Sequence, residues 1–241
     1  MMDNSYKEFV LYKGKKIEVK NGELRLPYDL ERFDEIEGLE LLTNLKKLHY
    51  KFFDLRKIEN LDNLKNLESL TLQDSHHLSK IENLDNLTNL RVLDLTDSNI
   101  AEIENLDNLK NLEILRLGKP YEMCENYITE IKGLENLSKL KELHLGHNRI
   151  KIIKGLDALT NLELLNLPWN QIREIEGLDN LSNLKELNLI HNNITEIKGL
   201  DNLINLKVLG IDYGPFSSNL RENWKKKGIH VWYSSSNGLL L

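Results

Sequence analysis

Residues 140–161 read LKELHLGHNRIKIIKGLDALTN, and residues 162–183 read LELLNLPWNQIREIEGLDNLSN. The two lines are equal in length, and their leucines and isoleucines fall at the same places. They share the skeleton L-x-x-L-x-L-x-x-N-x-I, which recurs along most of the chain. Self-similarity at a fixed short period is typical of a solenoid, in which each repeat forms one coil and buries its apolar side chains against the neighbouring coils.

Nine coils can be aligned on the first leucine of this skeleton, the first and last of them being atypical. Eight coils start at Leu45, Leu67, Leu90, Leu112, Leu140, Leu162, Leu184 and Leu206, so the differences between successive starting positions are 22, 23, 22, 28, 22, 22 and 22. Each L-x-x-L-x-L should form a short strand, and successive strands should pair in parallel about 4.8 Å apart in one curved sheet. The leucines then point inward, and the side chains between them point outward onto the concave face.

A degenerate first coil is expected to start at Glu23, one coil period before Leu45 (45 − 23 = 22). This alignment predicts Tyr28 as an inward side chain. It also predicts Arg25 at the outward third position and Leu30 at the outward eighth position.

The two ends of the chain depart from the repeat. A hairpin pattern precedes the first coil, because Phe9–Tyr12 is followed by a turn at Lys13 and Gly14 and by a second apolar stretch. After the last coil, a capping-box-like start and a terminal glycine predict a helix, and an apolar strand pattern follows it. The predicted divisions are a β-hairpin cap at 1–22, the solenoid at 23–214, a helix–strand cap at 215–233 and a flexible tail at 234–241.

Two columns of residues mark the turns of the coils. One position of the return segment holds only Gly or Asn, at Gly38, Asn60, Asn83, Asn105, Gly133, Gly155, Gly177 and Gly199. These residue types tolerate a positive φ, so we predict a left-handed backbone there. The ninth position holds asparagine in four consecutive coils, at Asn126, Asn148, Asn170 and Asn192. A buried asparagine ladder can satisfy the backbone groups of a tight loop, and we expect one here.

Segments such as ITEIKGLENLSKLKEL and IREIEGLDNLSNLKEL resemble the consensus of the short leucine-rich-repeat subclass typified by the nuclear regulatory subunit of type-1 protein phosphatase. The resemblance covers about Leu39 to Ile211. It implies an α/β solenoid, a horseshoe with a concave parallel β-sheet and short turns or 3-10 helices on the convex side. It also implies a non-catalytic scaffold that binds a protein through its concave face and regulates a phosphatase or another signalling enzyme. Bacterial internalins use a similar repeat, but they are exported and carry a helical cap of their own, and neither feature is visible in this sequence.

Composition narrows the function classes. A net charge of −6 with 29% charged residues describes a soluble surface rather than a basic nucleic-acid binder. The single cysteine, Cys124, rules out an intramolecular disulfide and favours a cytoplasmic protein. The start MMDNSYKEF lacks the regions of a signal peptide, and no apolar run approaches the roughly 18 residues of a membrane span. No phosphate loop, nucleophile–base motif or dinucleotide fingerprint occurs, so we expect no catalytic activity and no cofactor. We also expect a monomer that binds neither nucleic acid nor a membrane.

The candidate binding residues lie on the concave face of the carboxy-terminal coils. The eighth position of four consecutive coils holds ring side chains, at His147, Trp169, His191 and Tyr213. The fifth position contributes polar groups around them, at Arg116, His144, Asn166 and Asn188. Exposed aromatic residues flanked by polar groups are the usual composition of a binding hot spot, so we predict that these eight residues bind a protein partner. The alternative is that neighbouring rings merely pack on one another.

A metal site is a second possibility for the same histidines. His144 and His147 form an H-x-x-H pattern, and His191 shares the eighth position with His147. Two coils separate His147 from His191, which is roughly 10 Å at the backbone. Zinc needs its nitrogen ligands at about 2.0–2.1 Å in a closed set, and no cysteine or carboxylate completes that set. We therefore predict no metal.

The convex segments support a second function class. The stretches ENLDNLKNLE, ENLDNLTNLR and ENLDNLKNLE, at 59–68, 82–91 and 104–113, are nearly identical. Such uniformity is compatible with a passive structural or self-associating module that has no ligand on its concave face. The insertion at 118–128, which contains Cys124, lengthens the fifth coil and is either a binding loop or a tolerated insertion.

Overall fold

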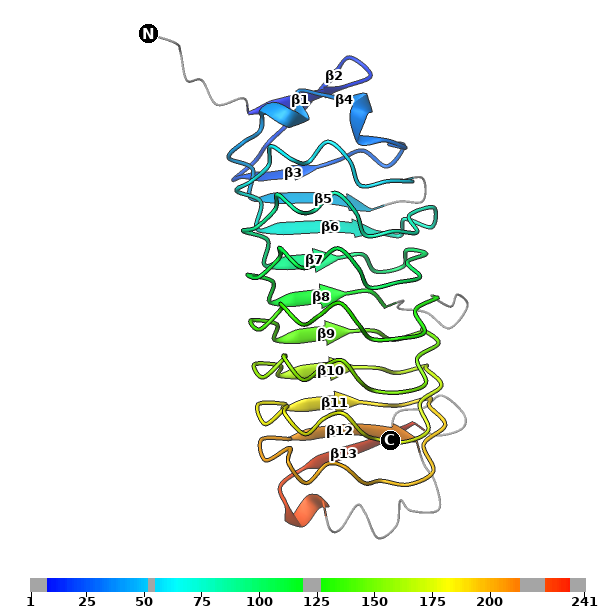
Figure 1. Cartoon of the computed structure of the whole chain (residues 1–241). Helices are drawn as coiled ribbons and strands as arrows, with labels where there is room; N and C mark the ends of the chain where they lie inside the picture. The colour runs from blue at the N-terminus through cyan, green and yellow to red at the C-terminus, as the bar shows by residue number, and fades with distance from the viewer. Residues whose placement is uncertain (1–7, 52–54, 119–126, 213–223, 235–241) are drawn as a thin grey trace.

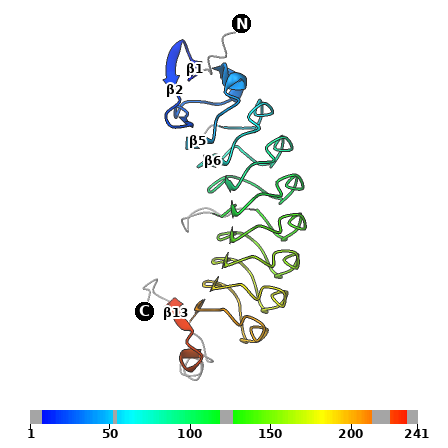
Figure 2. The same ribbon diagram turned by 90° about the vertical axis from the view of Figure 1, so that its left-hand side faces the viewer.

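The computed structural model describes residues 8–51, 55–118, 127–212 and 224–234. Within these ranges ten strands form one parallel sheet, stacked one below another with all arrows pointing the same way (Figure 1). In order along the sheet the strands are β3 (Glu23–Arg25), β5 (Lys47–Lys51), β6 (Ser69–Gln73), β7 (Val92–Asp94), β8 (Ile114–Arg116), β9 (Glu142–His144), β10 (Leu164–Asn166), β11 (Glu186–Asn188), β12 (Val208–Asp212) and β13 (His230–Ser234). Figure 2 shows the strands along the inner side of an arc and the return turns along its outer side.

The sheet forms because apolar side chains recur with period two in the strands and with the coil period between them. The fourth-position leucines of neighbouring coils pair directly, as Leu143 does with Leu165 and Leu165 with Leu187. These side chains are at most 1% exposed. Each buried leucine contributes roughly 1.5–3 kcal/mol, as an upper estimate, to the free energy of unfolding. The predicted solenoid of nine coils with inward leucines is confirmed.

The convex side consists of two consecutive tight turns in each coil. In a typical coil the Leu159 amide donates to the Leu156 carbonyl, and the Leu162 amide donates to the Leu159 carbonyl, both at 2.9 Å. The first coil instead contains two 3-10 helices, η1 (Phe33–Glu35) and η2 (Leu39–Leu41). Short turns and 3-10 helices on the convex side are therefore as predicted.

The return position that holds only glycine or asparagine is left-handed throughout, which confirms the prediction. Its φ lies between 57° and 82° in all eight coils. At Gly155 a Cβ atom would lie 2.6 Å from the carbonyl oxygen of Ile131 in the preceding coil, so the close approach of two coils excludes a larger side chain. Where asparagine occupies the position, as at Asn105, its Nδ2 donates to the corresponding carbonyl, that of Ile81, at 2.7 Å.

The asparagine ladder is present at Asn148, Asn170 and Asn192. Asn170 is typical, because its Oδ1 accepts the Ile150 amide at 3.0 Å. Its Nδ2 donates to the carbonyls of Leu145, Leu167 and Pro168 at 2.9, 3.2 and 3.3 Å. Each asparagine thus satisfies backbone groups of its own coil and of the preceding coil, as predicted. Asn126 lies outside the described residues.

Different structures occupy the two ends. At the amino-terminal end, β1 (Phe9–Tyr12) pairs in antiparallel fashion with β2 (Lys15–Glu18) and with β4 (Ile36–Glu37). At the carboxy-terminal end, residues 224–226 are helical and Gly228 has a φ of 75°. Strand β13 then pairs with β12 and extends the main sheet to Ser234, at the first position of the expected tail.

The predicted alignment of the first coil is wrong by two positions. Glu23 pairs with Lys47 and Arg25 pairs with His49, so Arg25 occupies the fifth position rather than the third. Leu30 is fully buried instead of facing outward, whereas Tyr28 is 69% exposed instead of facing inward. A shift of two positions keeps the same face of a strand, so the leucine pattern did not reveal the error.

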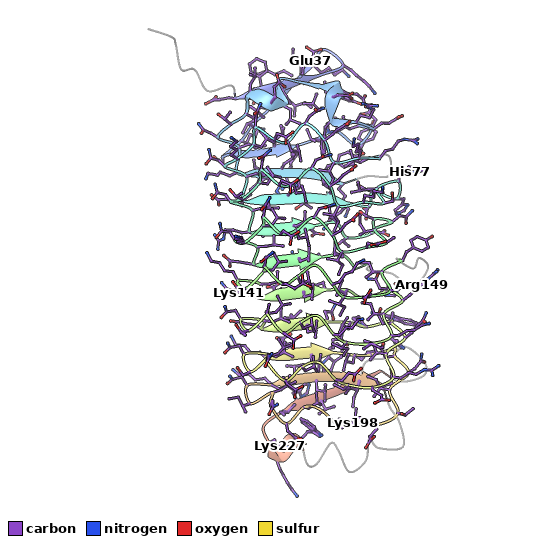
Figure 3. The ribbon with its side chains drawn as sticks, viewed as in Figure 1. Glu37, His77, Lys141, Arg149, Lys198 and Lys227 are labelled. Carbon is purple, nitrogen blue, oxygen red and sulfur yellow. The ribbon has the colours of Figure 1, made fainter. Side chains whose placement is uncertain are left out.

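A row of charged side chains, alternating in sign as far as Lys185, follows the edge where the strands begin. It occupies the second position of each coil and runs Lys46, Glu68, Arg91, Glu113, Lys141, Glu163, Lys185 and Lys207. Glu113 bridges two coils, since its oxygens lie 2.7 Å from Arg91 Nε and 2.8 Å from Lys141 Nζ. Figure 3 places Lys141 on this edge and Arg149 on the opposite edge, where the strands end. The hydrogen bonds from Arg91 and Lys141 lower the pKa of Glu113 to about 2.

Replacing a ladder asparagine should destabilise the fold more than replacing an outer-turn asparagine. In Asn170→Ala the buried Ile150 amide loses its partner and three carbonyls each lose one of their two donors, so we expect the free energy of unfolding to fall by about 2–3 kcal/mol. The matched control is Asn161→Ala, which removes one exposed bond to the Ser138 carbonyl and should cost less than about 1 kcal/mol. Urea unfolding measures both values, and equal losses would contradict the ladder's role.

Acid should weaken the charge row at Glu113. Its folded-state pKa lies below the ordinary 4.5, so its contribution to stability is present above about pH 4.5 and is lost as pH falls towards 2. Glu113→Gln should therefore flatten the decline in stability over that range and cost under about 1 kcal/mol at neutral pH. Glu163→Gln removes a carboxylate with a single lysine partner and should flatten the decline less. Denaturant midpoints measured from pH 7 to pH 2 test this, and parallel curves for wild type and Glu113→Gln would refute it.

Candidate functional site

Three of the four predicted rings form one continuous stack at the ends of the strands. The ring centroids of His147 and Trp169 lie 5.3 Å apart with an interplanar angle of 14°. Those of Trp169 and His191 lie 3.8 Å apart at 28°. The expectation of exposed rings is wrong for His147, which is only 7% exposed because the Trp169 ring stacks on it, and Trp169 and His191 are half-buried. The fourth predicted residue, Tyr213, lies outside the described residues.

The backbone beneath the stack is left-handed, which the sequence did not predict. The φ angles of His147, Trp169 and His191 are 54°, 56° and 57°. A positive φ is unfavourable for a bulky side chain, costing of order 1 kcal/mol or more, because its Cβ approaches the backbone. The corresponding position of the amino-terminal coils is occupied by Asp74 and Asp97, a residue type that tolerates this conformation better.

The predicted fifth-position residues lie in one row across four neighbouring strands. Arg116 pairs with His144, His144 with Asn166, and Asn166 with Asn188 in the strand register. Asn188 Nδ2 donates to Asn166 Oδ1 at 2.9 Å, and Asn188 Oδ1 accepts the Ile190 amide at 3.1 Å. The structure therefore brings these four residues together on the concave face, beside the ring stack.

The two members of the row nearest its amino-terminal end contact carboxylates within the chain, Arg116 through ion pairs and His144 through a hydrogen bond. Arg116 lies 3.1 Å from a carboxylate oxygen of Glu142 and 3.9 Å from one of Asp94. His144 Nε2 lies 3.3 Å from the same Glu142 oxygen. Burial lowers the pKa of His144, although Glu142 acts in the opposite direction. Imidazole at this site is therefore neutral at neutral pH, because its ordinary pKa is already near 6.5.

One concave residue was missed by the sequence analysis. Trp232, in β13, is in register with Gly210 and continues the fifth-position row beyond Asn188. A detectable signal existed, because Val231 follows the buried Leu209 by one coil period (231 − 209 = 22). The relation between Val231 and Leu209 was overlooked because the segment that joins them does not carry the leucine skeleton.

The remaining predictions concern the insertion, metal binding and membrane spans. Of the insertion at 118–128, residues 119–126, which include Cys124, lie outside the described residues. Among the residues that the structure describes, no group of three or more histidine, cysteine, aspartate or glutamate side chains could hold a metal ion. Nor does any helix in those same ranges have the length and apolar character needed to cross a bilayer.

Comparison with known proteins identifies the repeat. A family model described as "Leucine Rich repeats (2 copies)" matches residues 138–181. Internalin C2 of Listeria monocytogenes has a similar structure, with a TM-score of 0.69 and 29% sequence identity, over 79% of this chain and 80% of that protein. No curated protein matches the chain.

Two further solved structures are similar over part of their own length. A leucine-rich-repeat protein of Leptospira interrogans has a TM-score of 0.61 and 26% identity, over 80% of this chain and 56% of that protein. The functional domain of InlJ from Listeria monocytogenes, which includes a cysteine ladder, has a TM-score of 0.54. It is 18% identical over 79% of this chain and 44% of that one, and so shows the fold alone. The chain therefore has the leucine-rich-repeat solenoid fold, which generally serves as a non-catalytic protein-interaction scaffold.

Proposed function

We propose that this protein binds a protein partner through the concave face of its carboxy-terminal coils. The ring stack is the anchor, and the polar row lies beside it; the proposed contact residues are His147, Trp169, His191, Tyr213, Arg116, His144, Asn166 and Asn188. A half-buried tryptophan with polar neighbours is the composition that dominates binding energy in protein interfaces.

The observation that carries the proposal is the left-handed backbone under the rings. A side chain retained only for folding would be expected to suit its backbone, as Asp74 and Asp97 do at the same position. Trp169 instead occupies an unfavourable conformation on the edge of the binding face. Stacking against His147 and His191 offsets part of this cost, about 0.5–1.5 kcal/mol for an aromatic pair. Strained residues of this kind cluster at functional sites.

The runner-up function is a passive or self-associating module, which the nearly identical convex segments favour. Those segments have a local role, however, because their asparagines bind the preceding coil. The Asn89 side chain donates to the Lys65 carbonyl at 2.9 Å, and Asn86 donates to Asp62 Oδ1 at 2.9 Å. Their uniformity is therefore accounted for by coil stacking, without a second copy of the chain.

The repeat resemblance does not extend the proposal to a phosphatase. The residues that carry that resemblance are the leucines, isoleucines and turn residues of the coils. The apolar ones are buried, so they specify the fold and leave the partner open. The single cysteine in the sequence supports a cytoplasmic location as part of the proposal.

We also propose that the ends act as caps, at residues 1–22 and 215–233. A solenoid needs lids because its terminal coils have one inward face without a neighbouring coil. Val10 and Val231 support this, since they are 0% and 8% exposed and join the leucine core.

Replacing the central ring should remove binding without removing the fold. Trp169→Asn keeps a residue that tolerates the left-handed backbone, so relief of strain should offset the lost stacking and change stability by less than about 1 kcal/mol. Binding to a partner captured from lysate of the producing cells should weaken at least 30-fold, about 2 kcal/mol. Isothermal titration with the purified partner measures the affinity, and thermal unfolding measures the stability.

The matched control is Ile204→Asn, which changes a 79% exposed apolar residue on the outer turns. Its affinity should equal that of wild type. An unchanged affinity for Trp169→Asn would refute the proposal. Light scattering that shows growth in mass with concentration, together with the capture of no protein, would favour the self-associating module.

A further inference from the structure

The concave face continues beyond the last leucine-rich coil onto β13. Strand β13 pairs with β12 over five residues, and this places Trp232 beside Gly210. The fifth-position row on the carboxy-terminal half therefore runs His144, Asn166, Asn188, Gly210 and Trp232. It is continuous with the residues proposed above to contact a partner.

Gly210 sets the position of the Trp232 ring. A Cβ atom at residue 210 would lie 3.2 Å from Cε2 and from Cζ2 of Trp232, and 2.8 Å from Asn188 Oδ1. The indole thus lies over the glycine, next to the side-chain amide of Asn188, and stays half-buried. An aromatic ring held against a backbone in this way is a rigid platform at one end of the row.

The amide row presents hydrogen-bond donors. Asn188 Oδ1 is occupied by the Ile190 amide, and Asn166 Oδ1 by Asn188 Nδ2. Asn166 Nδ2 has no hydrogen-bond partner among the described residues, and Asn188 Nδ2 has a second hydrogen beyond its one bond. Successive amides lie about 4.8 Å apart along the sheet. Carbonyl oxygens of an extended polypeptide are acceptors that suit such donors.

Charge divides the concave face into two halves. In the amino-terminal half, charged side chains pair with each other, as in Glu23–Arg25 at 2.6 Å and Lys51–Asp74 at 3.9 Å. The last pair formed with an arginine or lysine on the strands is that of Arg116 and Glu142, at 3.1 Å, and beyond it His191 lies 3.8 Å from Asp212.

Beyond Arg116 and His144 the fifth-position row holds only uncharged side chains, at Asn166, Asn188, Gly210 and Trp232. The third position holds Leu164 and Val208, with Glu186 and His230 as exposed exceptions. Asp212, at the seventh position, already accepts the His191 and Asn192 amides. A charged ligand residue buried on the fifth-position row would lose its hydration without gaining an opposite charge there.

We propose that this half of the concave face takes an extended, uncharged peptide segment of the partner, with Trp232 as the anchor at its far end. The inference deepens the proposed function and rests on it. The Asn166 and Asn188 amides donate to the segment's main-chain carbonyls. Trp232 packs against an apolar or aromatic side chain of the segment, and the Trp169 stack borders its path on the side where the strands end.

The test uses random dodecapeptides displayed on phage and selected on the whole protein. Selected peptides are synthesised, and their affinities are measured by fluorescence polarisation at 50 mM and 500 mM NaCl. We expect a bound core without charged residues and a dissociation constant that changes less than about twofold between the two salt concentrations, because screening acts on charges. Peptides with a charged core and a dissociation constant that rises more than about tenfold with salt would overturn the inference.

Variants locate the peptide on the row. Trp232→Ala should weaken binding at least about tenfold, and Trp232→Phe should recover most of the loss. Gly210→Ala keeps the indole but displaces it together with the Asn188 amide, and should also weaken binding; it tests this end of the row in a chain that retains Trp232. Ile204→Asn is the control on the outer turns and should bind as wild type does.

The outcomes separate the two proposals. If Trp169→Asn weakens peptide binding while Trp232→Ala and Gly210→Ala do not, the inference about the end anchor fails and the proposed function stands. If none of the three changes affects binding, both fail. If no peptide can be selected, the inference fails, and the proposed function is decided by the affinity of Trp169→Asn for the captured partner. Loss of binding in all three, with Ile204→Asn unaffected, supports both.

Discussion

A single coil has no second layer of its own, so its leucines leave water only by packing against the next coil. Leu143, Leu165 and Leu187 illustrate this constraint, because each pairs with its equivalent one coil away and all are nearly inaccessible. Stability is therefore shared between neighbours rather than held within one repeat. Polar groups at the turns must be satisfied by the same neighbours, which explains the asparagine ladder and the glycine or asparagine at each return.

Because each coil must pack against the next, different regions of the surface have different roles. Side chains on the outer turns and on the edge where strands begin mostly bind the adjacent coil, as Asn89 and Glu113 do. The concave side chains are not needed for stacking to the same degree, so they can vary from coil to coil. They do vary, from paired charges near Arg25 to amides and rings near Asn188. A surface that varies over a uniform scaffold is suited to recognition.

The ring stack stands out because it conflicts with its own backbone. His147, Trp169 and His191 adopt a conformation that glycine, asparagine or aspartate would adopt at lower cost. The coils are rigid enough to hold these residues there, since the ladder asparagine that follows each ring is bonded to two coils. A strained position maintained by well-satisfied neighbours is where a binding role is best sought.

The coil period, the inward leucines, the left-handed return position and the ladder could all be predicted from the sequence, because each depends on contacts that repeat at one fixed separation. The sequence also predicted Trp169 beside His147 and His191, since equal positions in neighbouring coils must be adjacent. Three features could be seen only in the folded chain: the alignment of Glu23 with Lys47, the left-handed backbone under the rings and the presence of Trp232 on the concave face. At both ends the sequence departs from the repeat, so the register of β3 and of β13 depends on how each packs against the neighbouring coil. The positive φ of Trp169 could not be predicted either, because tryptophan does not favour this conformation and the neighbouring residues impose it.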